Sequence, residues 1–95
     1  MKIYLTAIIK AKGECKDEVL SVLKYMVEET RQEEACELYS LHQAIDNDNL
    51  FTFYEIWKSK SGLDNHNRQP YIQAFGKLIE EKLQEPPTIL ITALI

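Results

Sequence analysis

Glu55 is a carboxylate inside an aromatic run, and this position makes it the first candidate for chemistry. Residues 50–58 read Leu-Phe-Thr-Phe-Tyr-Glu-Ile-Trp-Lys, a pattern that predicts a strand. Because side chains alternate faces along a strand, Glu55 shares one face with Phe51, Phe53 and Trp57. A buried unpaired charge is costly, so Glu55 needs a partner, a shifted pKa or a wet cavity. The pattern therefore predicts an aromatic pocket for a small molecule.

His66 follows Trp57 by nine residues and is the best acid or base candidate. An unperturbed imidazole titrates near neutral pH, which suits proton transfer. Glu55 could orient His66 and stabilise its charged form, or it could be a structural carboxylate bonded to backbone or to Arg68. His66 could equally be a helix-end histidine bonded only to backbone. Phe53 and Trp57 could wall a site for a flat aromatic molecule, or they could be plain core residues.

The remaining polar candidates carry weaker signals. Tyr71 could donate its hydroxyl group into the cavity. Asn65 and Asn67, which flank His66, are typical of surface or capping residues. His42 lies in a predicted strand, where a histidine is more often a core residue than a ligand. Two histidines so far apart, together with isolated glycines, predict neither a metal site nor a phosphate-binding loop.

The composition indicates one globular domain spanning residues 1–95. Apolar residues make up 45% and charged residues 27% of the chain, which is ordinary for a soluble protein. The net charge of −4 and the scattered basic residues argue against a nucleic-acid partner. No stretch is apolar and long enough to span a membrane, and the first residues read as a strand rather than a signal peptide. Cys15 and Cys36 have no metal-ligand spacing, and nothing near Cys36 marks it as an activated thiolate, which favours reduced thiols in a cytoplasmic protein.

Six main elements must position these residues, in the order strand, helix, strand, strand, helix, strand. The predicted strands and first helix span residues 2–11, 16–32, 36–45, 50–58 and 88–95. Residues 46–49 are expected to form a hairpin turn, because Asn and Asp tolerate unusual backbone angles. Ser61 could cap a short helix that runs through His66. Pro70 is expected to start the second long helix, which the Pro86 and Pro87 pair ends.

This order predicts an α+β fold of the ferredoxin-like βαββαβ type, in which both long helices cover one face of an antiparallel sheet. The strands, however, carry apolar residues on both faces, and residues 89–95 are almost wholly apolar. An exposed strand of that kind is an aggregation hazard. We therefore expect a homodimer in which the uncovered sheet faces pack together.

Several segments together resemble a known family, the antibiotic biosynthesis monooxygenase (ABM) domains. The most specific is the aromatic-Glu-x-Trp strand followed by a histidine. The matching residues are 5–7, 27–31, Cys36, Tyr39, 53–57, His66 and 70–75. Two positions depart from the family pattern. Residues 33–36 read Glu-Glu-Ala-Cys where relatives commonly have an acid followed by Pro-Gly-Cys, and Tyr71 stands where many relatives have a second histidine.

The resemblance implies a dimeric α+β barrel and a cofactor-independent monooxygenase acting on a quinol-like or other enolisable small molecule. His66 would remove a proton with help from Glu55, and the resulting anion would react with oxygen. The residues expected to bind the substrate are Thr6, Phe53, Trp57 and Tyr71. The alternatives are haem degradation, although Thr6 stands where such relatives tend to have Asn, and sugar-phosphate isomerisation, for which Arg68 is the only nearby cation. A non-catalytic dimeric binding module is the alternative outside the enzyme class.

Overall fold

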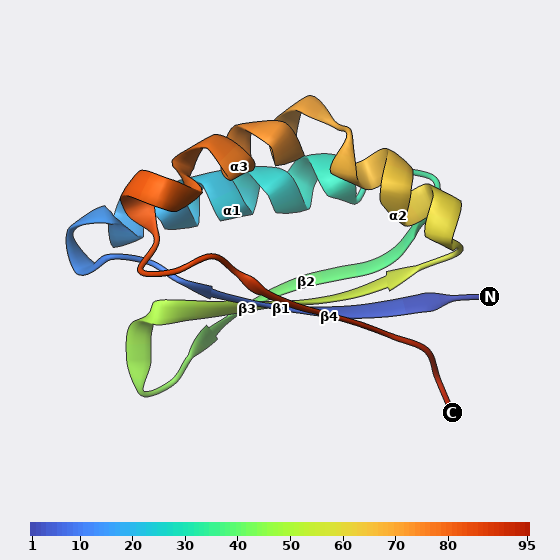
Figure 1. Cartoon of the computed structure of the whole chain (residues 1–95), viewed down its shortest axis with the longest axis horizontal. Helices are drawn as coiled ribbons and strands as arrows, with labels where there is room; N and C mark the ends of the chain where they lie inside the picture. The colour runs from blue at the N-terminus through green and yellow to red at the C-terminus, as the bar shows by residue number, and fades with distance from the viewer.

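A four-stranded antiparallel sheet carries all the helices on one face (Figure 1). The computed structural model describes residues Met1–Ile95. The strands run in the order β2-β3-β1-β4 across the sheet. Their bounds are β1 Ile3–Lys10, β2 Cys36–Ala44, β3 Asn47–Trp57 and β4 Thr88–Thr92. This arrangement confirms the predicted α+β ferredoxin-like fold.

Three helices and one 3-10 turn connect the strands. They are the short 3-10 turn η1 Gly13–Cys15, α1 Lys16–Thr30, α2 Lys60–Asn67 and α3 Pro70–Lys82. Pro70 is the first residue of α3, as predicted, because its fixed backbone angle suits that position. The cap of α2 is Ser59 rather than the predicted Ser61: its hydroxyl oxygen accepts a hydrogen bond from the Gly62 N–H at 3.1 Å. None of the helices is long and apolar enough to cross a membrane.

The hairpin between β2 and β3 is tighter than the sequence predicts. Only Ile45 and Asp46 form the turn, so β3 begins at Asn47 instead of Leu50. Ala44 pairs with Asn47 across this turn, and the pairing shifts register just before it. The other end of the sheet is also shorter than expected, because β4 stops at Thr92.

The core lies between the sheet and the helices. On β1 the buried residues alternate through Leu5, Ala7 and Ile9, and on β3 the buried face is the predicted one, with Glu55 among the aromatic residues. The strands pair so that Leu5 lies opposite Glu55. The helices contribute mainly Val19, Leu23, Met26 and Phe75 to this core. The predicted strand faces are confirmed, and they bring Glu55 underneath the helices.

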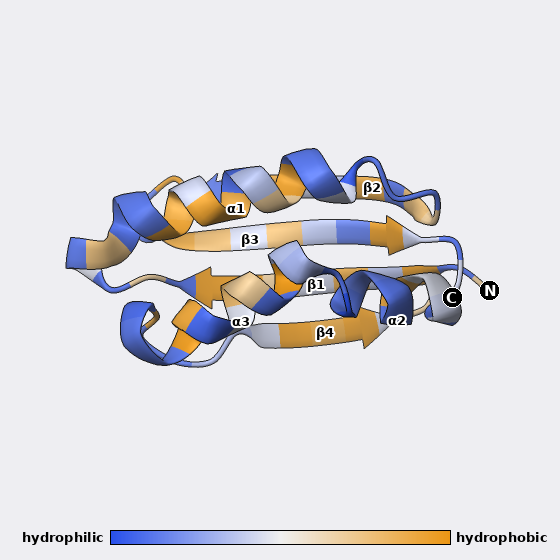
Figure 2. Cartoon of the chain, turned by 90° about the horizontal axis from the view of Figure 1, so that it is seen from above, coloured by the Kyte–Doolittle hydropathy of each residue, from blue (hydrophilic) through white to orange (hydrophobic).

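The other face of the sheet has no helix over it (Figure 1). Exposed apolar side chains on this face include Leu38, Tyr54 and Leu90. All five residues of β4 are exposed, because this strand forms one edge of the sheet and pairs only with β1. Figure 2 shows how apolar this edge strand is. Ile89 and Ile91 of β4 lie level with Ala7 and Leu5, and so face the helical side.

Candidate functional site

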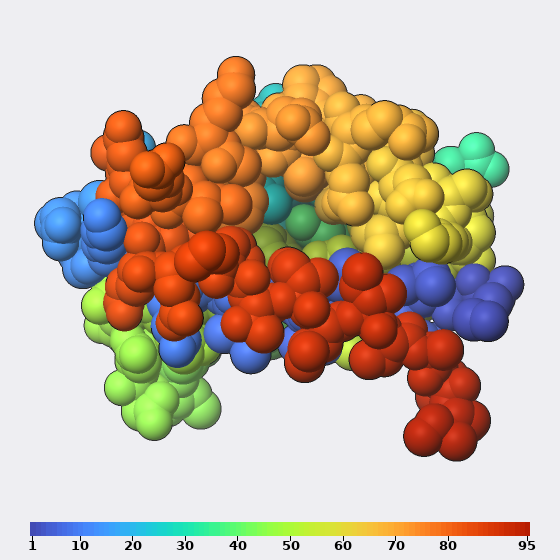
Figure 3. Space-filling model, viewed as in Figure 1, coloured from blue at the N-terminus to red at the C-terminus, as the bar shows by residue number.

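A cavity of about 190 Å³ lies between the sheet and the helices. Of its 14 lining residues, 10 are hydrophobic, and the lining comes from all four strands, from α1, α2 and α3, and from the segment before β4. Figure 3 shows the surface hollowed between α3, α2 and β4, with deeper atoms visible inside. A dry apolar cavity of about 150 Å³ is known to accommodate benzene. This cavity therefore has room for a ligand of one or two rings.

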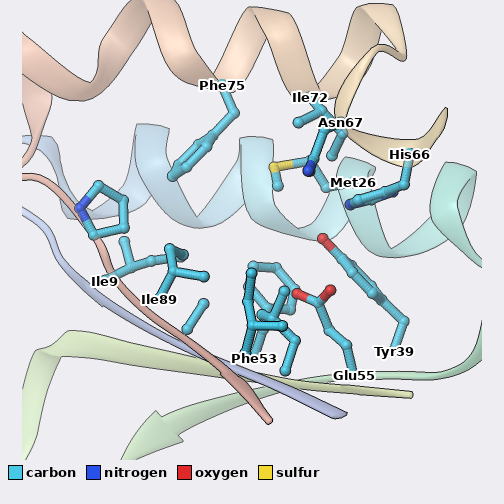
Figure 4. A pocket seen from close by; sticks show the side chains of 14 residues that line it. Ile9, Met26, Tyr39, Phe53, Glu55, His66, Asn67, Ile72, Phe75 and Ile89 are labelled. Carbon is cyan, nitrogen blue, oxygen red and sulfur yellow. The ribbon is translucent and has the colours of Figure 1, made fainter. Parts of the chain in front are cut away.

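The cavity has two chemically different ends, which Figure 4 shows from close by. At one end lie Ile9, Phe75 and Ile89, which present only carbon to the interior. At the other end His66 projects from α2 and Glu55 from β3. The polar groups are thus gathered at the end where α2 crosses the sheet.

His66 is held in place by Glu33, a residue in the segment between α1 and β2. His66 Nδ1 lies 2.8 Å from Glu33 Oε2, and the Tyr71 hydroxyl group donates to the same oxygen at 2.5 Å. The His66 side chain is only 4% exposed and that of Glu33 only 11% exposed. Since an ionised carboxylate only accepts hydrogen bonds, Nδ1 carries the proton and Nε2 keeps a free lone pair. Glu33 thus fixes both the orientation and the tautomer of His66.

The segment that carries Glu33 packs very closely on α2. A Cβ atom added to Gly62 would clash with the Cβ of Ala35, so only glycine permits this approach. The close contact brings the residues just before β2 against the first turns of α2. It explains how an acid 33 residues away along the chain reaches His66.

Glu55 is bonded to Trp57 and not to His66. The Trp57 indole N–H donates to Glu55 Oε1 at 2.9 Å, whereas Oε2 makes no hydrogen bond within the protein. Glu55 and His66 are therefore not hydrogen-bonded to each other, although both line the cavity, and the alternative bond from Glu55 to Arg68 is also absent. The sequence could not show this, because Glu33, the acid that bonds His66, lies 33 residues away from it along the chain.

Burial changes the protonation of both cavity groups. It raises the pKa of Glu55 to about 7, an effect that the Trp57 hydrogen bond partly opposes. Burial lowers the pKa of His66 below 6.5, although its bond to Glu33 acts in the opposite direction. The His66 ring also packs on Trp57, with ring centroids 4.5 Å apart. Near neutral pH the cavity therefore contains a neutral imidazole and a carboxyl group that is protonated in a large fraction of molecules.

Three of the four residues predicted to bind substrate lie outside the cavity wall. Phe53 lines the cavity, as predicted. Thr6 belongs to the other sheet face, since its neighbours Leu5 and Ala7 take the cavity side. Trp57 is fully buried behind Glu55, and Tyr71 contacts Glu33 instead of the cavity. The sequence places these residues in the right region but cannot assign which of them form the wall.

Other residues have roles that the sequence did not reveal. Tyr39 lines the cavity and stacks on Phe53, with ring centroids 4.7 Å apart. Asn67 is exposed, in agreement with the expected surface position, and it also contributes to the cavity lining. His42, expected as a core histidine, is exposed on β2. The one signal for Glu33 was its place in the acidic segment before Cys36, where the family pattern has its acid.

Neither thiols nor metal ligands are assembled for chemistry in this structure. Burial raises the pKa of Cys36 to about 11, so that its thiol stays protonated at neutral pH. No three His, Cys, Asp or Glu side chains converge in a way that could hold a metal ion. The groups that line the cavity are therefore the His66 imidazole, the Glu55 carboxyl group, the polar residues Tyr39 and Asn67, and apolar walls.

Comparison with known proteins identifies the family. The family model described as "Antibiotic biosynthesis monooxygenase" matches residues 2–78. The chain belongs to this ABM family. YcnE of Bacillus subtilis, whose description as a monooxygenase is itself provisional, is 33% identical over 92 residues, 97% of each chain. The uncharacterized protein sll1783 of Synechocystis sp. is 32% identical over 89 residues, and our chain spans 60% of its length.

Solved structures share the same ABM fold. The crystal structure of PA3566 from Pseudomonas aeruginosa superposes with a TM-score of 0.93 at 26% identity, covering 99% of this chain and 94% of the other. Rv0793 from Mycobacterium tuberculosis has a TM-score of 0.94 at 21% identity, with 100% and 96% covered, which is a likeness of fold alone. Family membership supports a monooxygenase-like function at the level of the family.

Proposed function

We propose that this ABM protein is a cofactor-independent monooxygenase for a small, uncharged quinol or similar enolisable molecule. The observation that carries the proposal is the free Nε2 of His66, which is anchored through Nδ1 to Glu33 beside an apolar cavity. A fixed, neutral imidazole is suited to remove a proton from a bound hydroxyl group. The apolar walls hold the ring and exclude water from the reacting atoms.

The proposed reaction needs only the quinol and molecular oxygen. His66 takes the hydroxyl proton, and a ring carbon of the resulting anion bonds to oxygen as a peroxide. The proton on His66 then passes to this peroxide, whose O–O bond breaks as water leaves. One oxygen atom stays in the product as a hydroxyquinone, while the quinol supplies the two electrons and two hydrogens of the water. Each turnover returns His66 to its neutral form.

Cavity size and charge favour this chemistry over the other two enzyme alternatives. A volume of about 190 Å³ lies below the roughly 300–1,000 Å³ of pockets for drug-sized ligands, and haem is larger still. No lysine or arginine lines the cavity, so a phosphorylated sugar would find no cation to pair with. An uncharged aromatic ring matches both the size and the apolar lining.

We also propose that two copies pack through the uncovered faces of their sheets. Leu38, Tyr54 and Leu90 are apolar side chains that a second copy would remove from water. Replacing Tyr54 with glutamate would place a charge in this contact. Sedimentation analysis would show a dimer for the natural chain and a shift toward monomer for Tyr54→Glu, and a natural chain that sediments as a monomer would contradict the pairing.

Oxygen uptake with a panel of menadiol-type hydroquinones tests the enzyme function. We expect uptake above the rate of spontaneous oxidation, and a loss of about 100-fold or more in His66→Ala. The matched control is His42→Ala, because His42 is an exposed histidine on β2 outside the cavity. If no hydroquinone is turned over above background, the function is not catalytic on this class. Mass spectrometry of a ligand retained through native purification would then identify a binding module.

A further inference from the structure

The cavity contains two groups that can transfer protons, and in each of them only one of the two polar atoms is hydrogen-bonded to the protein. His66 is bonded through Nδ1, which leaves Nε2 free, and Glu55 is bonded through Oε1, which leaves Oε2 free. The two groups come from different elements, α2 and β3, and both line the same cavity. Figure 4 shows them at the same end of it, with Tyr39 beside them. The oxygenation described above uses only the imidazole and leaves Glu55 without a task.

We propose that this cavity has a second, oxygen-independent activity: proton transfer between two carbons of a small uncharged β,γ-unsaturated ketone, with His66 as the base and Glu55 as the acid. The inference shares its site and its base with the proposed monooxygenase function. It differs in needing no oxidant and in making Glu55 a catalytic residue. It also defines the ligand class, since both groups act best on a neutral carbonyl compound.

The steps balance without any co-reactant. His66 Nε2 takes a proton from the carbon next to the carbonyl group, while the Glu55 carboxyl group donates its proton to the carbonyl oxygen, which gives a neutral dienol. In the second half His66 returns its proton to the far carbon of the dienol. Glu55 Oε2 takes back the hydroxyl proton as the carbonyl group forms again. The product is an isomer of the substrate, and both side chains regain their starting states.

The surroundings of Glu55 suit a proton donor. Its residue is 4% exposed and its neighbours across β1 and β2 are Leu5 and Tyr39, so no basic group pairs with it. Burial raises its pKa to about 7, so that a protonated form is available near neutral pH. A buried carboxylic acid that donates to a substrate carbonyl is an established way to stabilise an enolate. The Trp57 bond fixes Oε1 and thereby orients Oε2.

The test follows the conversion of cyclohex-3-enone to cyclohex-2-enone under an oxygen-free atmosphere. The conjugated product absorbs in the ultraviolet, so its formation is read directly. We expect the full chain to accelerate the conversion above buffer, and we expect this rate to fall at least 100-fold in His66→Ala and at least tenfold in Glu55→Gln. The amide oxygen introduced by Glu55→Gln can still accept the Trp57 hydrogen bond, so this variant should keep its fold, which circular dichroism checks. Glu14→Gln is the matched control, because Glu14 is an exposed acid in η1.

The outcomes separate this inference from the proposed function. Isomerisation without oxygen uptake on any quinol supports the inference and overturns the monooxygenase function. Oxygen uptake that depends on His66, with no isomerisation above buffer, overturns the inference and leaves the monooxygenase function standing. A folded Glu55→Gln protein that isomerises as fast as the natural chain would also overturn it, because Glu55 would then not be the acid.

Discussion

The two ends of the cavity are held in shape by different forces. At the polar end each working group is fixed by a hydrogen bond on its far side: His66 by Glu33, and Glu55 by Trp57. At the apolar end the side chains of Phe75 and Ile89 make only packing contacts, and Ile89 is 49% exposed. Under the proposed function, the polar end would transfer the proton and the apolar end would determine which ligands bind.

The largest expected effect concerns the polar end and its protonation. The folded-state pKa of Glu55 is about 7 against 4.5 for a free carboxyl group, so the folded protein keeps a proton that the unfolded chain loses between these values. The free energy of unfolding should therefore fall as pH rises from 4.5 to 7, by roughly 3 kcal/mol from this residue. Urea unfolding of the natural chain and Glu55→Gln across this range measures the difference.

His66 acts in the opposite direction and must be separated from this effect. Because its pKa is lowered on folding, it destabilises the protein as pH falls below 6.5. Subtracting the Glu55→Gln curve from the natural one removes this contribution, since both proteins contain His66. Parallel curves for the two proteins would show that Glu55 is not the buried acid described here.

Glu33→Gln should lower kcat, which depends on the polar end, and leave KM, which depends on the apolar end, nearly unchanged. The amide can still accept from His66 Nδ1 but no longer stabilises the protonated imidazole. Loss of a charge-assisted hydrogen bond costs about 1.5–3 kcal/mol, which corresponds to a fall in kcat of roughly 10- to 100-fold. We expect KM to stay within about twofold, as steady-state oxygen uptake would show. A changed KM with unchanged kcat would mean that Glu33 serves binding instead.

Phe75→Leu should have the opposite effect on the two kinetic constants: it should change ligand affinity and leave kcat unchanged. The shorter side chain removes apolar contact from the cavity wall, which weakens ligand affinity by about 1 kcal/mol, or roughly fivefold, and leaves kcat unaltered. Phe51→Leu is the matched control, because Phe51 is fully buried but does not line the cavity. Equal losses of affinity in the two variants would locate the ligand elsewhere.

Tyr71→Phe should give the smallest change. It removes one of the two donors to Glu33 Oε2 and leaves the His66 bond intact. We expect the free energy of unfolding to fall by about 1 kcal/mol and turnover to fall only two- to threefold, roughly in keeping with one hydrogen bond. A loss as large as that of Glu33→Gln would make Tyr71 a direct participant in proton transfer.

The sequence predicted the fold well because the fold follows from local patterns. Alternation on β1 and β3 identified the buried faces, and Pro70 marked the start of α3. The errors lie at ends and turns, such as the cap at Ser59 and the tight hairpin, where one or two hydrogen bonds decide between neighbouring residues. His42 was misjudged because it pairs with Thr52 and so lies on the uncovered face of the sheet.

The site was harder to predict, since its partners are distant along the chain. Periodicity put Glu55 on the right face and the resemblance drew attention to His66, but the acid bonded to His66 is Glu33. That pairing depends on the close approach of Gly62 to Ala35, a tertiary contact without a local signature. Thr6 is a similar case. Alternation along the strand predicts which face it lies on, but only the position of the helices shows that the cavity is on the opposite face.

Because β4 is an edge strand, the cavity wall that it forms has low local stability against opening. This strand is hydrogen-bonded to β1 alone, yet Ile89 and Ile91 close one side of the cavity. Edge strands exchange their amide hydrogens faster than central ones, since they open by local fraying. A ligand packed against β4 would stabilise the pairing of this strand with β1. Part of the binding free energy would therefore oppose the fraying. The residence time of the ligand and the hydrogen-exchange rate of residues 88–92 would then both depend on how often β4 separates from β1.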